Sequence, residues 1–129
     1  MKEAHIRPIF YYKHYYLDFF QSLNSEVKTK LIWTIKFIAT NQSIPVVILK
    51  RIENAYGLYE IRLEVETNFY RVFCFFDQEK LIILINGFRT KSKRTSIREI
   101  ELGQKIKKEY FYGKNGIKPI ARKQIKSIW

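Results

Sequence analysis

Three polar side chains occupy positions from which a β-sheet could present them together. Arg62 lies in YEIRLEV, Arg71 in NFYRVFCFF and Asn86 in LIILINGF. Side chains alternate between the two faces of a strand, so residues paired across neighbouring strands share a face. A two-residue turn at 66–67 predicts Arg62 opposite Arg71, and a second such turn at 78–79 predicts Arg71 opposite Asn86. These three residues would then form a row across one face.

The two arginines in this row require a compensating anion. Like charges directly opposite each other destabilise a sheet by roughly 0.2–1 kcal/mol. Glu60 and Glu64, on the same strand as Arg62, are close enough in sequence to supply the negative charge. A phosphate is the alternative, because guanidinium groups bind phosphate oxygens in a bidentate manner. The sequence leaves both interpretations open.

A basic segment directly follows the last of these strands. It reads FRTKSKRTSIR and has no acid before Glu99. A solvated run of charge and a contact surface for RNA are equally compatible with it. Its basic residues are Arg89, Lys91, Lys93, Arg94 and Arg98.

The element that positions these residues is a three-stranded antiparallel meander within residues 57–95. Its apolar runs are rich in β-branched and aromatic residues and are separated only by ETN and DQEK, which is typical of strands joined by tight turns. Residues 5–12 are expected to form another strand, restricted by Pro8 to its own start or to an edge. Residues 46–51 are expected to form a short extended segment.

Helical periodicity flanks the meander on both sides. Aromatic residues between 12 and 23 predict a short helix ending near Ser22, and Asn24 or Ser25 caps a second helix. Ser96, with Glu99 three residues later, fits a capping box for a C-terminal helix ending near Tyr110. We therefore predict an α+β fold in which two N-terminal helices pack on an antiparallel sheet of three to five strands, followed by a C-terminal helix. The buried stripes expected in the second and last helices are Val27, Leu31, Ile35 and Ile38, and Ile97, Ile100, Ile106 and Tyr110.

Composition limits the class of protein. The 129 residues suit one domain over 1–112 and a basic extension over 113–129, and the net charge of +12 favours a polyanionic partner such as nucleic acid. The extension is expected to form a small helix or a basic arm. A single cysteine, Cys74, excludes an internal disulfide, and His5 and His14 have no third ligand for a metal. We expect a buried thiol, no metal, no cofactor and no membrane segment, hence a cytoplasmic protein.

The ordered set GLYEIR, NFYRVFCFF, ILINGFRTKSKRT and EIELGQKIKKEY resembles the phage-derived HigB-type branch of the RelE/ParE toxin superfamily. The resemblance covers roughly residues 10–110 and implies a compact, RelE-like fold with the same arrangement of helices and sheet. It implies a toxin that cleaves mRNA on the ribosome without a metal, through attack of the ribose 2′-OH on the adjacent phosphate. It also implies a cognate antitoxin, often a helix-turn-helix protein, as partner.

The resemblance assigns roles to individual residues. Arg71 and Arg62 would stabilise the phosphate, Lys91 would do the same or assist proton transfer, and Arg94 matches a basic position of the family. Lys93 is displaced from the family pattern. Asn86 replaces a frequent histidine; it can orient an oxygen but carries no proton at neutral pH. The predicted catalytic residues are Arg71, Arg62, Lys91 and Asn86, and the predicted RNA-binding residues are Arg89, Lys93, Arg94, Arg98 and Tyr110.

Three alternatives stay open. Tyr110 or Tyr112 either supplies the general acid of the reaction or docks its aromatic ring against the sheet. Because the histidine is missing, a non-catalytic, ParE-like inhibitor of DNA gyrase is a rival function on the same scaffold. A basic RNA- or ribosome-binding module with a decayed site is the other rival.

Overall fold

The computed structural model of the protein describes residues 5–113 and 125–129. The predicted meander is confirmed: β3 (Tyr59–Val65), β4 (Asn68–Asp77) and β5 (Leu81–Thr90) pair antiparallel in chain order. Most of the basic extension, including Lys114, Lys118, Arg122 and Lys123, lies outside the described residues.

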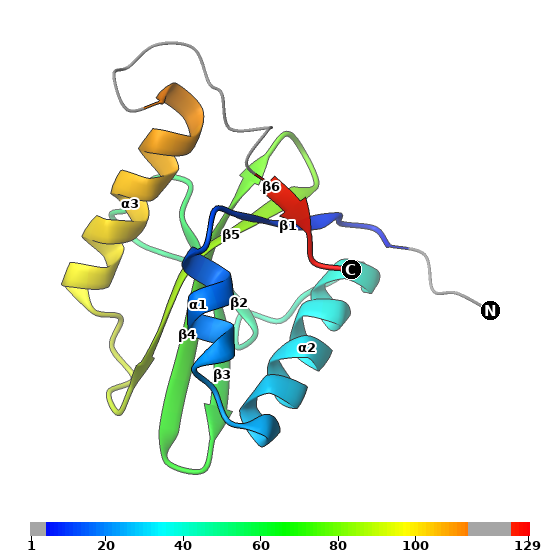
Figure 1. The fold of residues 1–129 in the computed structure, drawn as a ribbon, viewed down its shortest axis with the longest axis vertical. Helices are drawn as coiled ribbons and strands as arrows, with labels where there is room; N and C mark the ends of the chain where they lie inside the picture. The colour runs from blue at the N-terminus through cyan, green and yellow to red at the C-terminus, as the bar shows by residue number, and fades with distance from the viewer. Residues whose placement is uncertain (1–4, 114–124) are drawn as a thin grey trace.

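Three short strands extend the meander. β2 (Leu49–Arg51) pairs antiparallel with β3, β1 (Ile9–Tyr12) pairs parallel with β5, and β6 (Ile125–Ser127) pairs antiparallel with β1. Over the described residues the sheet is six-stranded and mixed, in the order β2-β3-β4-β5-β1-β6 (Figure 1). The expectation of a purely antiparallel sheet of three to five strands was therefore wrong. Pro8 directly precedes β1, as expected, but β1 is an interior strand.

The second and third helices begin where the sequence predicts, and the first begins later. Tyr12 ends β1, so α1 (Tyr15–Gln21) is shorter than its aromatic pattern suggests. α2 (Ser25–Thr40) is capped by Asn24, whose side-chain oxygen accepts a hydrogen bond from the Val27 backbone N–H at 3.0 Å. α3 (Ile97–Tyr112) is capped by Ser96 in the same manner.

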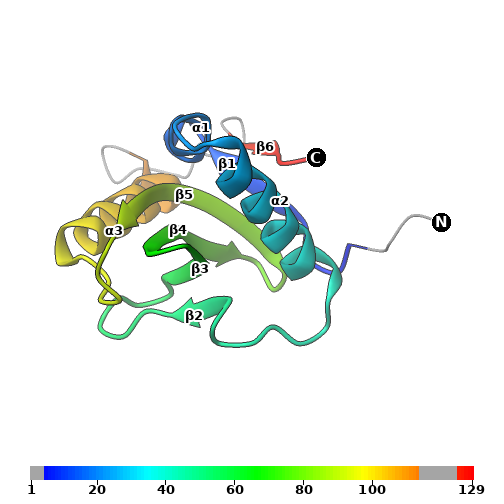
Figure 2. The same cartoon turned by 90° about the horizontal axis from the view of Figure 1, so that it is seen from below.

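Two apolar cores sandwich the sheet. On one face, α1 and α2 cover side chains that include Ile61, Val72 and Leu84, while on the other face α3 covers Phe73 and Ile83. In Figure 2, α1 and α2 lie above β5, and α3 lies at the left of the view. Cys74 is fully buried in the first core, and burial raises the pKa of its thiol, which confirms the structural role expected for it.

The stripe predicted for α2 is buried throughout, but the stripe predicted for α3 is only partly correct. Ile106 and Tyr110 are buried, whereas Ile97 is 74% exposed because it lies in the first turn, at the end of the sheet. Among the described residues, none of the helices combines the length and the apolar character needed to cross a membrane.

Candidate functional site

The predicted pairing of the two arginines is confirmed. Val65 lies opposite Asn68, so Arg62 lies opposite Arg71, and the two side chains share the face of the sheet that α3 covers further along β4. The two-residue turn sets this register. A one-residue slip would move every side chain of a strand to the other face of the sheet.

The predicted pairing of Arg71 with Asn86 was wrong: Arg71 lies opposite Phe88. The turn after β4 contains three residues, since Asp77 pairs with Leu81, and the register shifts once more between Val72 and Cys74. This second shift is a β-bulge, which places one additional residue in β5. Neither displacement follows from the turn residues or the apolar pattern of the two strands.

Asn86 still lies on the α3 side of the sheet, but it is tied to the helix. It is 4% exposed, and its Nδ2 donates hydrogen bonds to the backbone oxygen and to Oε1 of Glu99, at 3.3 and 3.1 Å. These contacts hold the first turn of α3 against β5. Its predicted role in orienting a ribose or phosphate oxygen stays a prediction.

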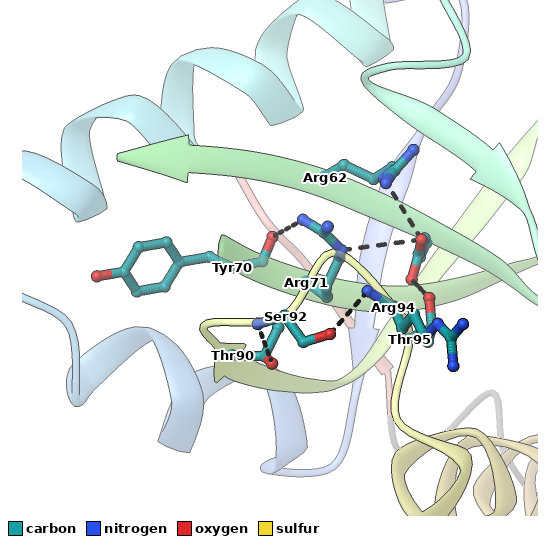
Figure 3. Close-up of polar contacts among 8 residues, drawn as sticks. Arg62, Tyr70, Arg71, Thr90, Ser92, Arg94 and Thr95 are labelled. Atoms are coloured by element: carbon teal, nitrogen blue, oxygen red, sulfur yellow. Dashed lines mark hydrogen bonds and ion pairs between the residues drawn. The ribbon is translucent and has the colours of Figure 1, made fainter. Parts of the chain in front are cut away.

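A buried carboxylate lies between the two arginines. Oε1 of Glu60 is 3.4 Å from Nε of Arg62 and 3.8 Å from Nε of Arg71, and the Glu60 side chain is 1% exposed (Figure 3). Glu60 is thus the compensating anion that the sequence suggested. Glu64 acts on Arg71 in the same sense as Glu60, so the two arginines and the two glutamates together carry no net charge. The positive excess that could attract a further anion comes from Lys30 and Lys93, which line the adjacent pocket.

Arg71 is the more buried of the two arginines. Its side chain is 3% exposed, and its Nη1 donates a hydrogen bond to the Tyr70 backbone oxygen at 3.4 Å. Burial lowers the pKa of the Arg71 guanidinium, and the nearby Arg62 lowers it further, whereas Glu60 acts in the opposite direction. Nε of Arg71 has no hydrogen-bond acceptor among the described residues. Such an orphaned buried donor is costly, and an anionic oxygen would satisfy it.

Arg62 is half-open to solvent, with 24% of its side chain exposed. Together with Arg71 it lines a pocket of about 470 Å³ whose lining comes from both faces of the sheet, because Leu63 and α2 lie on the face opposite to the arginines. Lys30, on α2, and Lys93, after β5, are also in the lining. No pattern in the sequence indicates Lys30, because its place in this lining arises from the packing of α2 against the sheet.

The basic segment after β5 is held in place by its own hydroxyl groups. Backbone N–H groups of Ser92 and Arg94 donate to the Thr90 and Ser92 hydroxyls, each at 3.1 Å. The Thr95 hydroxyl donates to Oε2 of Glu60 at 2.8 Å and so ties the segment to the arginine cluster (Figure 3). This tether was not predicted. Lys91, Lys93 and Arg94 themselves are exposed.

The remaining predicted RNA-binding residues do not all reach this cluster. Arg89 pairs with Tyr70, which belongs to the α1 and α2 core, so Arg89 lies on the face opposite to Arg71. Arg98 is exposed in the first turn of α3.

The RNA contact predicted for Tyr110 does not fit its surroundings. Tyr110 is 2% exposed, its hydroxyl donates to Oδ2 of Asp77 at 2.6 Å, and its ring packs edge-on against Tyr12 and Phe75. Asp77 ends β4 at a distance of six residues from Arg71, which is about 20 Å along a strand. The docking of Tyr110 against the sheet, the other role that the sequence allowed, is the one observed.

Comparison with known proteins identifies the family. The model of a family described as "Phage derived protein Gp49-like (DUF891)" matches residues 18–108, from α1 to the last turns of α3, and so includes the whole arginine cluster and the basic segment. No curated protein matches the chain. The matched region is well over half of the chain, and this protein therefore belongs to the phage-derived Gp49-like family, a family of toxin–antitoxin toxins related to RelE and HigB.

Proposed function

We propose that this protein is the toxin of a type II toxin–antitoxin system and that it cleaves mRNA on the ribosome. The observation that carries the proposal is the arginine cluster, in which Arg62 and Arg71 share one buried carboxylate and line a pocket together with Lys30 and Lys93. The Gp49-like family is associated with toxins that have nuclease activity, which supports the same conclusion. The fold is then a six-stranded variant of the RelE-like one.

The reaction suited to such a site is an internal transesterification. The ribose 2′-oxygen bonds to the adjacent phosphorus while the bond to the 5′-oxygen breaks, which leaves a 2′,3′-cyclic phosphate and a 5′-hydroxyl. The proton of the 2′-OH is lost to a base and the leaving oxygen gains a proton. No metal or cofactor enters this scheme. Negative charge grows on the non-bridging oxygens, and preorganised cations there contribute several kcal/mol.

The two arginines differ in how they meet that charge. Arg62 is accessible from the pocket, so it is the first to contact a phosphate. Arg71 has an unsatisfied Nε–H, which a phosphate oxygen would pair once the neighbouring side chains make room. The Phe69 ring, whose centre lies 5.3 Å from the guanidinium carbon of Arg71, is one side chain that would have to move.

The exposed segment after β5 supplies contacts to the rest of the RNA backbone. Lys91 stabilises the phosphate or assists proton transfer, and Lys93 and Arg94 bind neighbouring phosphates or ribosomal RNA. The net charge of +12 suits both these polyanions and a small acidic antitoxin, for which a helix-turn-helix protein is the expected class.

The test is expression of the wild type and of Arg62→Ala, followed by mapping of the 5′-ends of cellular mRNA. We expect cuts at codons for the wild type and at least a 100-fold loss in the variant, because a preorganised donor to the transition state typically contributes that much. Arg51→Ala, which removes an exposed arginine of β2, is the matched control and should cleave normally. Arg71→Lys keeps a buried cation and should also lose most activity.

Equal cleavage by the wild type and both cluster variants would remove the arginines from the site. Growth arrest with DNA-damage signalling and without mRNA cuts would show that the target is DNA gyrase instead. Growth arrest with neither signal would leave a binding module that acts on the ribosome without cleavage.

A further inference from the structure

Trp33 is a large aromatic side chain that the core does not explain. It lies on the outer surface of α2, 60% exposed, and its ring stacks on that of Phe37 with 5.6 Å between the centroids and 24° between the planes. Phe37 lies one turn further along the helix and does not line the arginine pocket, whereas Trp33 does. The stacking contact therefore fixes the indole at the edge of this pocket.

The pocket combines an apolar wall with a basic rim. Val47, Ile48, Leu63 and Phe69 supply apolar and aromatic surface beside Trp33. The flanking Val46 and Val47 are 66% and 70% exposed, so apolar surface continues outside the pocket. A concave site with a mainly apolar lining and a few convergent polar groups is typical of small-molecule and nucleotide sites.

Charge decides which occupant such a pocket favours. Four cations line it, and among the described lining residues Glu64 is the one acid. Lys30 donates to the backbone oxygen of Glu64, and within the described part of the chain neither Lys30 nor Lys93 forms an ion pair with a carboxylate. The positive charge of the rim is therefore available. The cations are Lys30, Arg62, Arg71 and Lys93.

We propose that this pocket binds one nucleotide of single-stranded RNA, with the base stacked on Trp33 and its phosphate between Lys30, Arg62 and Lys93. The proposal rests on the proposed function and names a base-binding subsite next to its reaction centre. Stacking of a base on an aromatic side chain together with cations along the backbone is how proteins bind single strands without reading their sequence. Trp33 thus places the adjacent phosphate at the two arginines.

Tryptophan fluorescence tests the stacking directly. The chain contains two tryptophans, so Trp129→Phe leaves Trp33 as the single reporter in the full-length protein. We expect a short single-stranded RNA, blocked with 2′-O-methyl groups against cleavage, to quench this emission at saturation. Polyphosphate of matched charge has no base to stack and should leave the emission within a few per cent of its starting value.

Anisotropy of a labelled RNA of the same sequence gives the second measurement, independent of Trp129. Trp33→Ala should weaken binding about 5-fold or more, the lower end expected for loss of one stacked base, and Trp33→Phe should recover most of it. Ile32→Ala, an exposed neighbour outside the pocket, is the matched control and should bind normally. Lys30→Ala should also weaken binding. Lys28→Ala should not, because Lys28, although it lies on the same helix as Lys30, is placed over the ring of Phe20 of α1.

The outcomes separate this inference from the proposed function. The subsite is overturned, even if mRNA is cleaved, by two results together. RNA binds Trp33→Ala as tightly as it binds the wild type, and RNA does not quench the tryptophan emission of the Trp129→Phe protein. Quenching and weakened binding in a protein that never cuts mRNA would refute the proposed reaction and retain the nucleotide site. Equal quenching by polyphosphate would overturn base stacking.

Discussion

At the scale of single residues, Glu60 supplies the buried negative charge of the arginine cluster. It is 1% exposed, it lies within 4 Å of both Nε atoms, and it accepts a hydrogen bond from Thr95. A buried guanidinium without a counter-charge is strongly unfavourable. Glu60 therefore stabilises the two guanidinium groups on the face of the sheet where the strand register places them.

Replacing Glu60 by Gln should destabilise the protein by about 1–3 kcal/mol in chemical denaturation. This is at or below the usual cost of breaking a buried ion pair, because the two separations, 3.4 and 3.8 Å, are long. Inorganic phosphate should then raise the melting temperature of Glu60→Gln more than that of the wild type, because the added anion replaces the lost carboxylate.

Glu64→Gln provides the control, since Glu64 is exposed on the same strand and its substitution should change the free energy of unfolding by no more than about 0.5 kcal/mol. Wild-type stability in Glu60→Gln, together with an unchanged response to phosphate, would show that the carboxylate does not compensate the arginines.

At the scale of elements, the position of α3 depends on close contact with the bulged part of β5. Gly103 is the helix residue at this contact. A Cβ placed there would lie 2.9 Å from Cδ2 of Phe73 and 3.3 Å from Oδ1 of Asn86. A glycine inside this helix is thus a packing requirement, and it lets α3 approach the strand that leads into the basic segment.

Gly103→Ala should therefore destabilise the protein by roughly 1–2 kcal/mol, although Ala is the better helix former by about 1 kcal/mol. The buried Phe73 ring must shift to admit the new methyl group, and overpacking of this kind typically costs 1–3 kcal/mol. Denaturant unfolding measures the change. Gln104→Ala, at the exposed neighbouring position, should be neutral or slightly stabilising, and a Gly103→Ala protein more stable than the wild type would contradict the packing argument.

At the scale of the whole molecule, the charge excess favours a polyanionic partner. Basic residues outnumber acidic ones by 24 to 12. The described termini lie together on the sheet, since β6 pairs with β1 and the ring of Trp129 lies 5.2 Å from that of His5. The C-terminal strand thus lies on the side of β5 away from the arginine cluster, because β3 and β4 lie on the other side of β5.

Affinity for single-stranded RNA should fall steeply with salt. With about four phosphate contacts, an increase from about 50 to 200 mM salt should weaken binding at least tenfold, because each neutralised phosphate releases counterions. Lys93→Ala should reduce the slope of log K against log salt by about 0.7. Lys80→Ala, in the turn at the other end of the β4–β5 hairpin, should leave the slope unchanged, and equal slopes for all three proteins would exclude Lys93 from the contact.

The sequence by itself determined the features that depend on neighbouring residues. The two-residue turn after Val65 set the pairing of Arg62 with Arg71, and Asn24 and Ser96 set the starts of α2 and α3. A turn length, a cap and an apolar stripe each act over a few positions, so their physical effect can be read from the local sequence.

Only the tertiary structure decided the features that join distant segments. The three-residue turn after β4 and the bulge in β5 together moved Phe88 into the place expected for Asn86, and β1 paired parallel with β5. Packing of α2 placed Trp33 in the lining of the arginine pocket. These arrangements depend on how complete side-chain surfaces fit together, and the burial of Arg71 follows from the same fit. No local pattern encodes that fit, because the free energy of each contact depends on residues far away in the chain.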